Sequence, residues 1–387
     1  MVRLGDQLKT HPPSVRRGPL LTPPVEEGPP VNTDGVRPPP AEDVQDPRTF
    51  GEDVVSARKE YPGHSGAGIA TLAVRDLLAP VLLGRDADLI EGAWQAMYQE
   101  ALLHGRAGSV VRGLSAVDIA LWDRSARAAA MPLHKYLGGH SDEVPAYASG
   151  GYYLEGKGVD GLAAELQGYR DLGFTAFKIK VGRLGVEDDR ARIAAAREVI
   201  GPEGLLMLDA NNAWSDLPSA LRALRRWEEF DPYFIEEPFA PDDIENHARL
   251  ARATPITVAT GEIEAGRWRA KSLLDAEAAV ILQCDAAVCG GLSELRKIAD
   301  LASAYGATLA PHWFHDLHAP MVAAFPAAIF VEYFVGHDIH NIGSLLDREF
   351  DVANGVIRLH QTPGLGFGFS EEALDRYLVG PWEVVEK

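Results

Sequence analysis

Seven short polar motifs follow one another between Phe177 and Phe334, and each stands at the end of an apolar run. Together they supply two lysines, three regularly spaced acids, an Asp/His couple and a further Glu. The residues are Lys178, Lys180, Asp209, Glu236, Glu262, Asp285, His312 and Glu332. In a β/α barrel, catalytic groups project from the carboxyl ends of several different strands. The repeated order of apolar run, polar motif and helix therefore predicts an enzyme.

Three of the acids, Asp209, Glu236 and Glu262, end consecutive predicted strands at separations of 27 and 26 residues. Neighbouring strands lie about 5 Å apart, so the three carboxylates can converge on one cation. All-oxygen ligation that leaves positions for water or substrate suits Mg²⁺. We therefore predict a magnesium site, although a single acid at a strand end is about as often a helix N-cap. Glu237 points away from Glu236 and is expected to support the ligands.

Lys178 and Lys180 lie two residues apart and so project to the same face of their strand. Charging two adjacent ammonium groups near a cation is costly, so at least one lysine pKa is expected to fall. A neutral amine would then be available as a base. The alternative is a solvated lysine pair at a strand end, which the other motifs make the weaker interpretation.

Asp285 and His312 end the next two predicted strands and lie 27 residues apart. A carboxylate beside an imidazole selects its tautomer and raises its basicity, which gives a second acid/base group. Glu332, on the last strand, could donate a hydrogen bond if crowding by other carboxylates keeps it neutral. Asn211 is expected on the same side as Asp209, where it could contact a substrate hydroxyl.

His315 and His318 follow His312 on the exit loop and helix, where surface or supporting roles are expected. Cys284 and Cys289, the only two cysteines of the chain, are interpreted as small core residues rather than as a disulfide or metal clip.

The apolar pattern predicts the elements that would position these residues. Strands are predicted at 144–153, 176–181, 205–209, 233–236, 256–260, 280–285, 308–312 and 330–334. Continuous apolar runs are typical of parallel strands buried on both faces, and stretches with helical apolar spacing separate them. Further helices are predicted at 69–83, 89–103 and 114–130. Residues 1–60 contain a cluster of prolines without helix or strand periodicity, and are interpreted as disordered or loosely attached.

Composition narrows the possible partners. The chain has 387 residues and a formal net charge of −19, which disfavours nucleic acids and anionic membranes. A small anionic substrate stays possible because a bound divalent cation would dominate the field inside the site. No apolar run reaches the roughly 18 residues of a membrane span, and the start lacks a signal-peptide pattern, so the cytoplasm is the expected location.

Taken together, Mg²⁺ and Glu332 would hold a substrate carboxylate between a lysine base on one face and His312 on the other. Such an arrangement suits abstraction of the proton α to the carboxylate, with the metal stabilising the resulting enediolate.

These ordered motifs resemble those of the enolase superfamily, in its mandelate racemase subgroup, over roughly Gly68 to Phe369. The resemblance implies an α/β protein with a (β/α)7β TIM-type barrel and an α+β capping domain formed from N-terminal and C-terminal segments. It implies cap helices in 61–140, the catalytic barrel in 141–340 and a returning segment in 341–387. Residues 1–60 depart from the family because they lack the antiparallel strands with which its cap normally opens. This departure affects substrate selection and closure of the site.

By motif match, Asp209, Glu236 and Glu262 resemble the metal ligands. Lys180, with Lys178 beside it, resembles the base on one face. Asp285 and His312 resemble the catalytic dyad, and Glu332 the electrophilic acid.

The resemblance favours a dehydratase that converts a sugar acid into a 2-keto-3-deoxy acid, acting as a homo-oligomer on a small carboxylate substrate. The alternatives are a racemase or epimerase that uses bases on both faces, and a non-catalytic product with a defective cap. Substrate selection would fall to loop residues, for which Trp214, Trp313, His337 and His340 are candidates.

Overall fold

The computed structural model describes residues 67–336 and 342–377. The prediction for residues 1–60 and the selectivity roles suggested for His337 and His340 lie outside this part of the chain.

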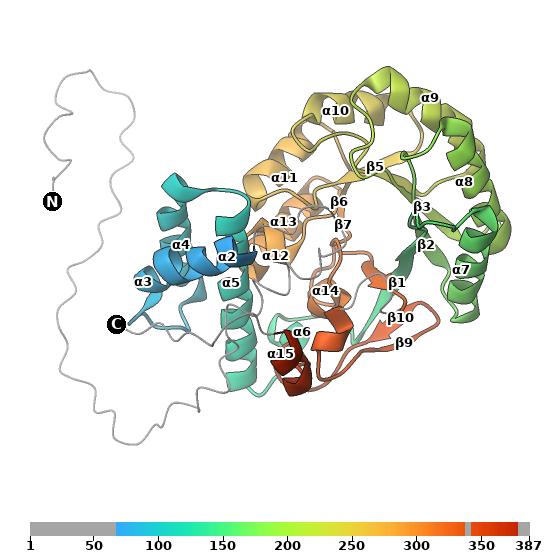
Figure 1. The fold of residues 1–387 in the computed structure, drawn as a ribbon. Helices are drawn as coiled ribbons and strands as arrows, with labels where there is room; N and C mark the ends of the chain where they lie inside the picture. Colours follow the sequence, from blue (N-terminus) through green and yellow to red (C-terminus); the bar gives the residue numbers. More distant parts are fainter. Residues whose placement is uncertain (1–66, 337–341, 378–387) are drawn as a thin grey trace, which may run out of the picture. The chain divides into compact units, whose positions relative to one another are not determined.

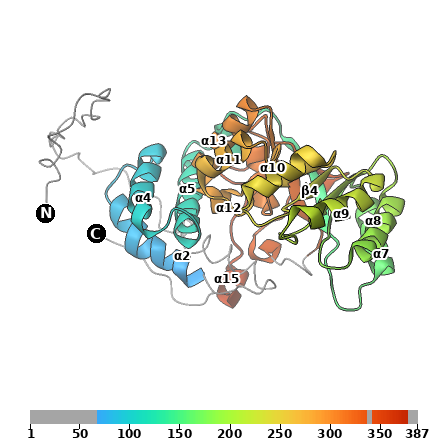
Figure 2. The same cartoon turned by 90° about the horizontal axis from the view of Figure 1, so that it is seen from above.

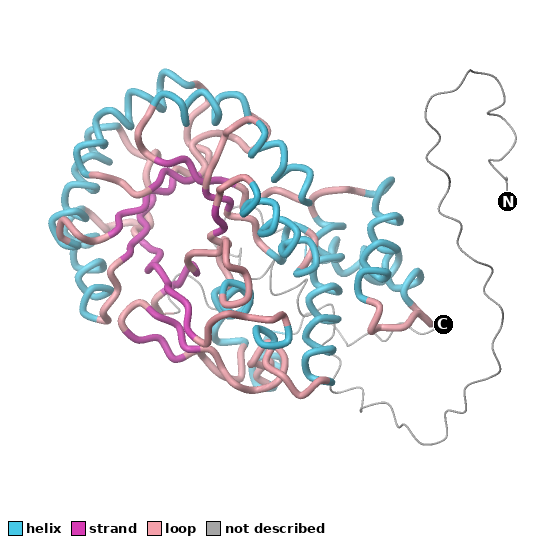
Figure 3. Tube along the Cα trace, turned by 180° about the vertical axis from the view of Figure 1, so that it is seen from behind, coloured by secondary structure: helices cyan, strands magenta, loops and turns pink. Residues whose placement is uncertain are grey.

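A barrel of parallel strands forms the centre of the described structure, with helices around its outside (Figures 1 and 3). The strands are β1 (Glu143–Gly150), β2 (Ala176–Lys180), β3 (Leu205–Asp209), β4 (Phe234–Glu236), β5 (Thr257–Thr260), β6 (Ile281–Leu282), β7 (Thr308–Leu309) and β8 (Val331–Phe334). Successive strands from β1 to β7 pair in parallel, and β8 pairs with β1. A bridge between Leu309 and Ala328, just before β8, closes the ring.

The observed strands differ from the predicted ones mainly at their carboxyl ends. β3 has the predicted bounds, whereas β1 stops at Gly150 and β6 at Leu282. After β6 the chain turns into a helix, because the Asp285 carboxylate accepts a hydrogen bond from the Ala287 N–H and caps it. The functional residues of β6 and β7 therefore lie in the turns that follow these strands.

Helices separate the strands and cover the outside of the barrel. They are α7 (Val159–Asp171), α8 (Val186–Ile200), α9 (Leu217–Trp227), α10 (Ile244–Ala253), α11 (Gly266–Asp275), α12 (Ala286–Cys289), α13 (Leu292–Ala304) and α14 (His315–Val322), with the 3-10 turn η3 (Glu228–Phe230) after α9. α9 illustrates their design. Asp216 caps its first turn by accepting from the Ser219 N–H at 2.8 Å, and Ala220, Leu224 and Trp227 bury one face. Within the described residues, no helix combines the length and the apolar character needed to cross a bilayer.

A layer of apolar side chains fills the barrel interior below the predicted site. Its buried members come one from each of β1 to β6 and from the residue after β7, and they are Tyr147, Ala176, Met207, Phe234, Ala259, Ile281 and Ala310. Phe330, just before β8, packs against them. This packed layer closes the barrel, so any ligand must bind at the carboxyl ends of the strands.

The segment before the barrel forms a helical cap. Its elements are α2 (Ala67–Ala73), the π-helical turn η2 (Val74–Leu78), α3 (Ala79–Leu82), α4 (Ile90–His104), α5 (Ser109–Ala128) and α6 (Leu133–Tyr136). The helix predicted over 69–83 thus contains a π-helical turn, and α5 begins before its predicted start. Leu78, Trp94, Met97 and Leu114 are among the buried side chains that hold these helices together.

α12 lies beside α5 of the cap (Figure 2), and hydrogen bonds from the cap hold the turn that follows α12. The Trp94 indole N–H donates to the Gly290 carbonyl at 2.7 Å, and the Gly290 N–H donates to Ser115 Oγ at 3.0 Å. Asp118 on α5 accepts from both the N–H and the hydroxyl of Ser293, at 2.9 and 2.6 Å. The predicted dyad residue Asp285 caps the start of α12, so the cap domain and the dyad lie at opposite ends of one short helix.

The C-terminal segment contacts both the barrel and the cap. Its elements are η4 (Ile342–Leu345), β9 (Asp351–Ala353), β10 (Val356–Arg358) and α15 (Glu371–Tyr377). β10 pairs antiparallel with the first half of β1. Further along, the Leu365 N–H donates to Asp123 on α5 at 2.6 Å, and Arg127 donates to the Phe367 carbonyl at 2.9 Å.

Candidate active site

A ring of side chains lies directly above the apolar layer. Strand side chains alternate between faces, so the residue two positions after each interior apolar residue points to the same interior. The ring consists of Ser149, Lys178, Asp209, Glu236, Gly261, Gln283, His312 and Glu332. Five of these are predicted site residues. Ser149 and Gln283 were missed as site residues, although their spacing from Tyr147 and Ile281 on the same strands could have identified them.

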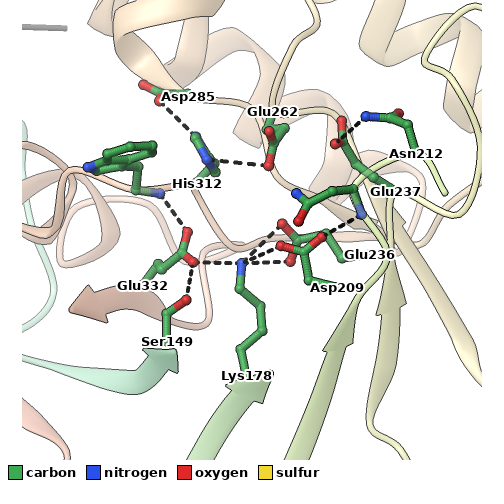
Figure 4. Close-up of polar contacts among 12 residues, drawn as sticks. Ser149, Lys178, Asp209, Asn212, Glu236, Glu237, Glu262, Asp285, His312 and Glu332 are labelled. Carbon is green, nitrogen blue, oxygen red and sulfur yellow. Dashed lines mark hydrogen bonds and ion pairs between the residues drawn. The ribbon is translucent and has the colours of Figure 1, made fainter. Parts of the chain in front are cut away.

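Lys178 is the centre of the ring's ion pairs (Figure 4). Its ammonium lies 2.8 and 3.0 Å from the two Glu236 oxygens, 2.6 Å from Glu332 and 3.7 Å from Asp209. Burial disfavours the charged amine, but Glu236, Glu332 and Asp209 outweigh it and raise the pKa of Lys178 well above its ordinary value. Lys178 is therefore not the lysine whose pKa falls, because acids rather than a second cation are its nearest charges, and the prediction that at least one of the two pKa values is lowered rests on Lys180.

Lys180 lies nearer the open end of the barrel. It is 7% exposed, against 1% for Lys178. Its ammonium is bonded to Asp209 and lies 5.1 Å from the centre of the Tyr152 ring. The two lysines of β2 thus share Asp209 as a partner, as expected from their common face.

Glu332 accepts hydrogen bonds from three directions. Ser149 Oγ donates at 2.7 Å, the Trp313 N–H donates at 2.8 Å, and Lys178 forms the ion pair. Burial would raise the pKa of Glu332, but Lys178 and His312 pull it well below its ordinary range. The neighbours of Glu332 are thus cations and hydrogen-bond donors, which favour its ionised, accepting form over the neutral form that would donate a hydrogen bond.

His312 bridges two carboxylates. Its Nδ1 lies 3.2 Å from Asp285 and its Nε2 lies 3.3 Å from Glu262. Burial would lower the pKa of His312, but Glu262 and the hydrogen bond with Asp285 raise it to about 9. The predicted increase in basicity is confirmed. His318 has the supporting role: it is fully buried, accepts from the Ala286 N–H at 3.0 Å and lies 3.4 Å from Asp285.

Of the three acids predicted as metal ligands, Asp209 and Glu236 share the Lys178 ammonium, whereas Glu262 contacts His312. Asp209 and Glu236 are paired in register across β3 and β4, while Glu262 faces His312. Burial and the charge of Asp209 raise the pKa of Glu236 to about 8. Across the described ranges, no three acidic, histidine or cysteine side chains surround one point as metal ligands would. The Lys178 ammonium bonds to Glu236 and lies close to Asp209.

The donor set nevertheless fits a hard divalent cation. The site contains six carboxyl groups against four basic groups. The acids are Asp209, Glu236, Glu237, Glu262, Asp285 and Glu332, and the bases are Lys178, Lys180, His312 and His318. Glu237 Oε2 accepts from Asn212 at 3.0 Å, whereas its buried Oε1 has no hydrogen-bond partner in the described structure. Burial and the charges of Glu262 and Asp209 raise the pKa of Glu237. An excess of crowded oxygen donors is the environment that Mg²⁺ neutralises.

The sequence matches the family described as enolase C-terminal domain-like over residues 161–373, which is more than half of the chain. Residues 59–138 match the N-terminal domain of the mandelate racemase / muconate lactonizing enzyme family. The chain belongs to the enolase superfamily. Both the predicted family and the predicted barrel with a cap are thereby confirmed.

Relatives within the enolase superfamily act on sugar acids. An L-talarate/galactarate dehydratase from Salmonella typhimurium is 36% identical over 296 residues, covering 76% of this chain and 73% of the relative. A 3,6-anhydro-alpha-L-galactonate cycloisomerase from Streptomyces coelicolor is 36% identical over 317 residues, covering 82% and 86%. The crystal structure of L-talarate dehydratase from Polaromonas sp. JS666, complexed with Mg and L-glucarate, has a TM-score of 0.75 at 33% identity and covers 80% of this chain and 85% of that chain.

Backbone strain gathers at the strand ends of this enolase-superfamily site. Five residues other than glycine that follow β3, β4 and β7 have positive φ: Asn211 (43°), Asn212 (62°), Glu237 (42°), Trp313 (59°) and Phe314 (25°). Such conformations are costly and persist where the surrounding structure holds them, often at functional sites. They lie directly after Asp209, Glu236 and His312, where the chain leaves β3, β4 and the turn that follows β7.

Three further residues that the sequence singled out are Asn211, which contacts the ring, and Trp214 and His315, which pack against aromatic side chains. The Asn211 backbone N–H donates to the Asp209 carboxylate at 2.9 Å, and contact of its side chain with a substrate hydroxyl stays a prediction. Trp214 packs against Trp227 of α9, with ring centres 5.8 Å apart. His315 lies against the Tyr333 ring at 4.5 Å.

The two cysteines, Cys284 and Cys289, are unpaired and buried, as predicted. Burial raises the pKa of both thiols, which agrees with a role in packing.

A cavity of about 110 Å³ adjoins the ring on the side of β7 and β8. Residues that follow or flank the ring positions of these strands line it, among them Trp313, His315, Tyr333 and Phe334. None of the eight ring residues, all of which the structure describes, lines this cavity. Trp313 borders both places, because its N–H binds Glu332 and its ring lies 5.4 Å from that of His312.

Proposed function

We propose that this chain is a Mg²⁺-dependent dehydratase of a sugar acid. It removes the proton α to the carboxylate and eliminates the β-hydroxyl, which yields a 2-keto-3-deoxy acid. The arrangement around the acid cluster supports this proposal: Lys180 is bonded to the cluster through Asp209, and His312 is bonded to it through Glu262. Two potential acid/base groups on different strands therefore border one set of carboxylates.

In this proposal Asp209, Glu236 and Glu262 hold the metal. When bound, Mg²⁺ neutralises these carboxylates and supplies Lewis-acid stabilisation for the negative charge that develops on the substrate carboxylate. Lys178 orients that carboxylate. Its ammonium already binds the carboxylates of Glu236 and Glu332, and a substrate carboxylate is the same kind of partner.

Lys180 is the proposed base, with His312 as the alternative for a substrate of the opposite configuration. The amine of Lys180 takes the proton from the α carbon, and the electrons of the broken C–H bond form the C=C bond of an enol. His312, which is protonated at neutral pH because its pKa is about 9, gives its Nε2 proton to the β-hydroxyl. The hydroxyl leaves as water, and the enol takes up a proton at the β carbon to form the keto acid.

The test is a screen of sugar acids with purified protein and Mg²⁺, in which 2-keto-3-deoxy products are detected. Lys180→Ala is expected to abolish the product. Lys271→Ala is the matched control, because Lys271 lies on the outer helix α11 and pairs with Asp275, and it should leave the rate unchanged. Absence of product from every sugar acid, with Mg²⁺ still bound, would contradict the dehydratase proposal.

An isomerase is the second candidate, because the cycloisomerase relative is as similar to this chain as the dehydratase. The same proton abstraction would begin a cycloisomerisation or the 1,1-proton transfer of a racemase or epimerase. Incubation in D₂O separates these reactions. A racemase or epimerase returns an isomer with deuterium at the α carbon, a cycloisomerase gives an isomer without loss of water, and a dehydratase loses water. A protein that binds Mg²⁺ but shows neither exchange nor turnover would be the non-catalytic product.

A further inference from the structure

Gln283 stands apart from the other polar members of the ring. It is fully buried, and neither its Oε1 nor its Nε2 has a hydrogen-bond partner among the described residues. The ring neighbours are all engaged: Ser149 and Lys178 with Glu332, Asp209 with Lys180, and His312 with Glu262.

The position of Gln283 places its side chain in the same interior. Ile281, two residues earlier, belongs to the apolar layer inside the barrel, whereas Leu282 packs in the core outside it. The Gln283 N–H donates to the Thr260 carbonyl at 2.9 Å, so the ladder between β5 and β6 continues to this residue. Alternation then directs the amide inward, between the ring positions of Gly261 and His312.

An unpaired amide at this depth is costly, because it has given up water without gaining a partner. Native interiors keep few such groups, and functional sites are the usual exception, where a ligand completes the hydrogen bonding. The depth of Gln283 does not separate it from the predicted machinery. Asp209 and Glu236 are 0% exposed and Lys178 and Glu332 are 1% exposed, so a ligand that reaches these residues enters the same buried layer.

We propose that Gln283 is a further substrate-binding residue, whose Nε2 donates to and whose Oε1 accepts from one hydroxyl of the bound sugar acid. The inference rests on the proposed function and adds a specificity determinant to it. A hydroxyl matches the amide because it both donates and accepts, whereas a carboxylate can only accept. A site that hydrogen-bonds a hydroxyl through a buried group rejects the analogue that lacks it, because the amide then stays unpaired.

Gln283→Met tests this role, since methionine keeps the length of the side chain and removes both polar atoms. Binding is measured by calorimetry in a Lys180→Ala background, which prevents turnover, with the sugar acid found in the screen. The dissociation constant is expected to rise about tenfold or more. One deoxy analogue should bind equally to the two proteins. Ile281→Val, one layer below on the same strand, is the control and should leave the dissociation constant within about twofold. An unchanged constant in Gln283→Met would overturn the proposal.

A second measurement needs no substrate and therefore separates this inference from the proposed function. Unliganded Gln283→Met is expected to unfold at the same temperature as the parent protein or about 2 °C higher, because a buried unpaired amide is replaced by an apolar group. A melting temperature lower than that of Ile281→Val would show that the amide already has a partner in the resting protein, such as an ordered water, and would refute the substrate role. If the stability gain appears while no sugar acid is turned over, the dehydratase proposal fails alone.

Discussion

Two hydrogen bonds between the cap and the barrel predict how much unfolding free energy their loss would cost. Asp118 on α5 is fully buried and accepts from the N–H and the hydroxyl of Ser293, at the start of α13. Asp118→Ala leaves both donors buried and unpaired. Each such group costs about 1–3 kcal/mol, so the variant should lose roughly 2–6 kcal/mol of unfolding free energy. Asp118→Asn keeps an acceptor oxygen and should lose much less.

The same residue predicts a dependence on pH. Burial raises the pKa of Asp118 from 3.8 to about 7, and the hydrogen bonds from Ser293 only partly oppose this. The folded state therefore holds the proton over a range where the unfolded state has released it. This contribution to stability is complete below pH about 4 and is lost as the pH rises to about 7. Between pH 5 and pH 8 the loss is about 3 kcal/mol. The amide of the Asp118→Asn protein cannot titrate, so that protein lacks this loss.

Urea unfolding of the wild type and of both variants at pH 5 and pH 8 measures these differences. The unfolding free energy of Asp118→Asn relative to wild type should rise by about 3 kcal/mol from the lower to the higher pH. The reasoning is refuted if this difference is the same at both pH values, or if Asp118→Ala is no less stable than Asp118→Asn. The hydrogen bonds between Asp118 and Ser293 also hold the chain just after α12, and Asp285 caps the other end of this short helix. Asp118→Ala should therefore lower kcat more than Asp118→Asn does.

Three further outcomes are expected. Asp285→Asn removes one of the groups that raise the pKa of His312 to about 9. The alkaline limb of the pH–rate profile should therefore move about one unit towards lower pH. If the limb does not move, His312 is not the group that causes it. Removal of divalent cations by EDTA should abolish turnover and lower the melting temperature, because the crowded carboxylates lose their counter-charge. Added Mg²⁺ should restore both the turnover and the melting temperature. A protein whose activity and stability are unaffected by EDTA would contradict the metal site. Gly364→Ala should lower the unfolding free energy by about 1–3 kcal/mol in a denaturant titration. Gly364 has a φ of +79°, and an added Cβ would lie 2.2 Å from an Asp123 oxygen. An unchanged unfolding free energy would show that the C-terminal segment does not depend on the close contact between Gly364 and Asp123.

The chemistry of the ring was largely readable from the sequence. The acids and bases recur about one β/α unit apart, and parallel strands bring their carboxyl ends to one end of a barrel whatever the details of packing. Alternation then determines that Lys178 and Lys180 share a face, which their common bonds to Asp209 bear out. The extent of the strands was less readable, because Asp285 begins a helix where the apolar run predicted continued strand.

The directions of the pKa shifts needed the tertiary structure. Lys178 on β2 meets Glu236 on β4 and Glu332 on β8, and neither of these strands is a hydrogen-bonded neighbour of β2. Sequence reasoning considered the second lysine and a nearby cation, and so predicted that the pKa of at least one lysine falls. Contacts across the barrel decide that Lys178 is not that lysine, because they raise its pKa.

The sequence by itself determined which residue types stand at the strand ends and in what order, because spacing along the chain is enough to set strand, helix and face. Only the tertiary structure decided the partners of these residues: the donors that surround Glu332, the hydrogen bonds between the cap and the residues after α12, and the absence of a partner for the Gln283 amide among the described residues. Each of these depends on side chains from segments far apart in the chain meeting at hydrogen-bond distance, which local periodicity does not encode.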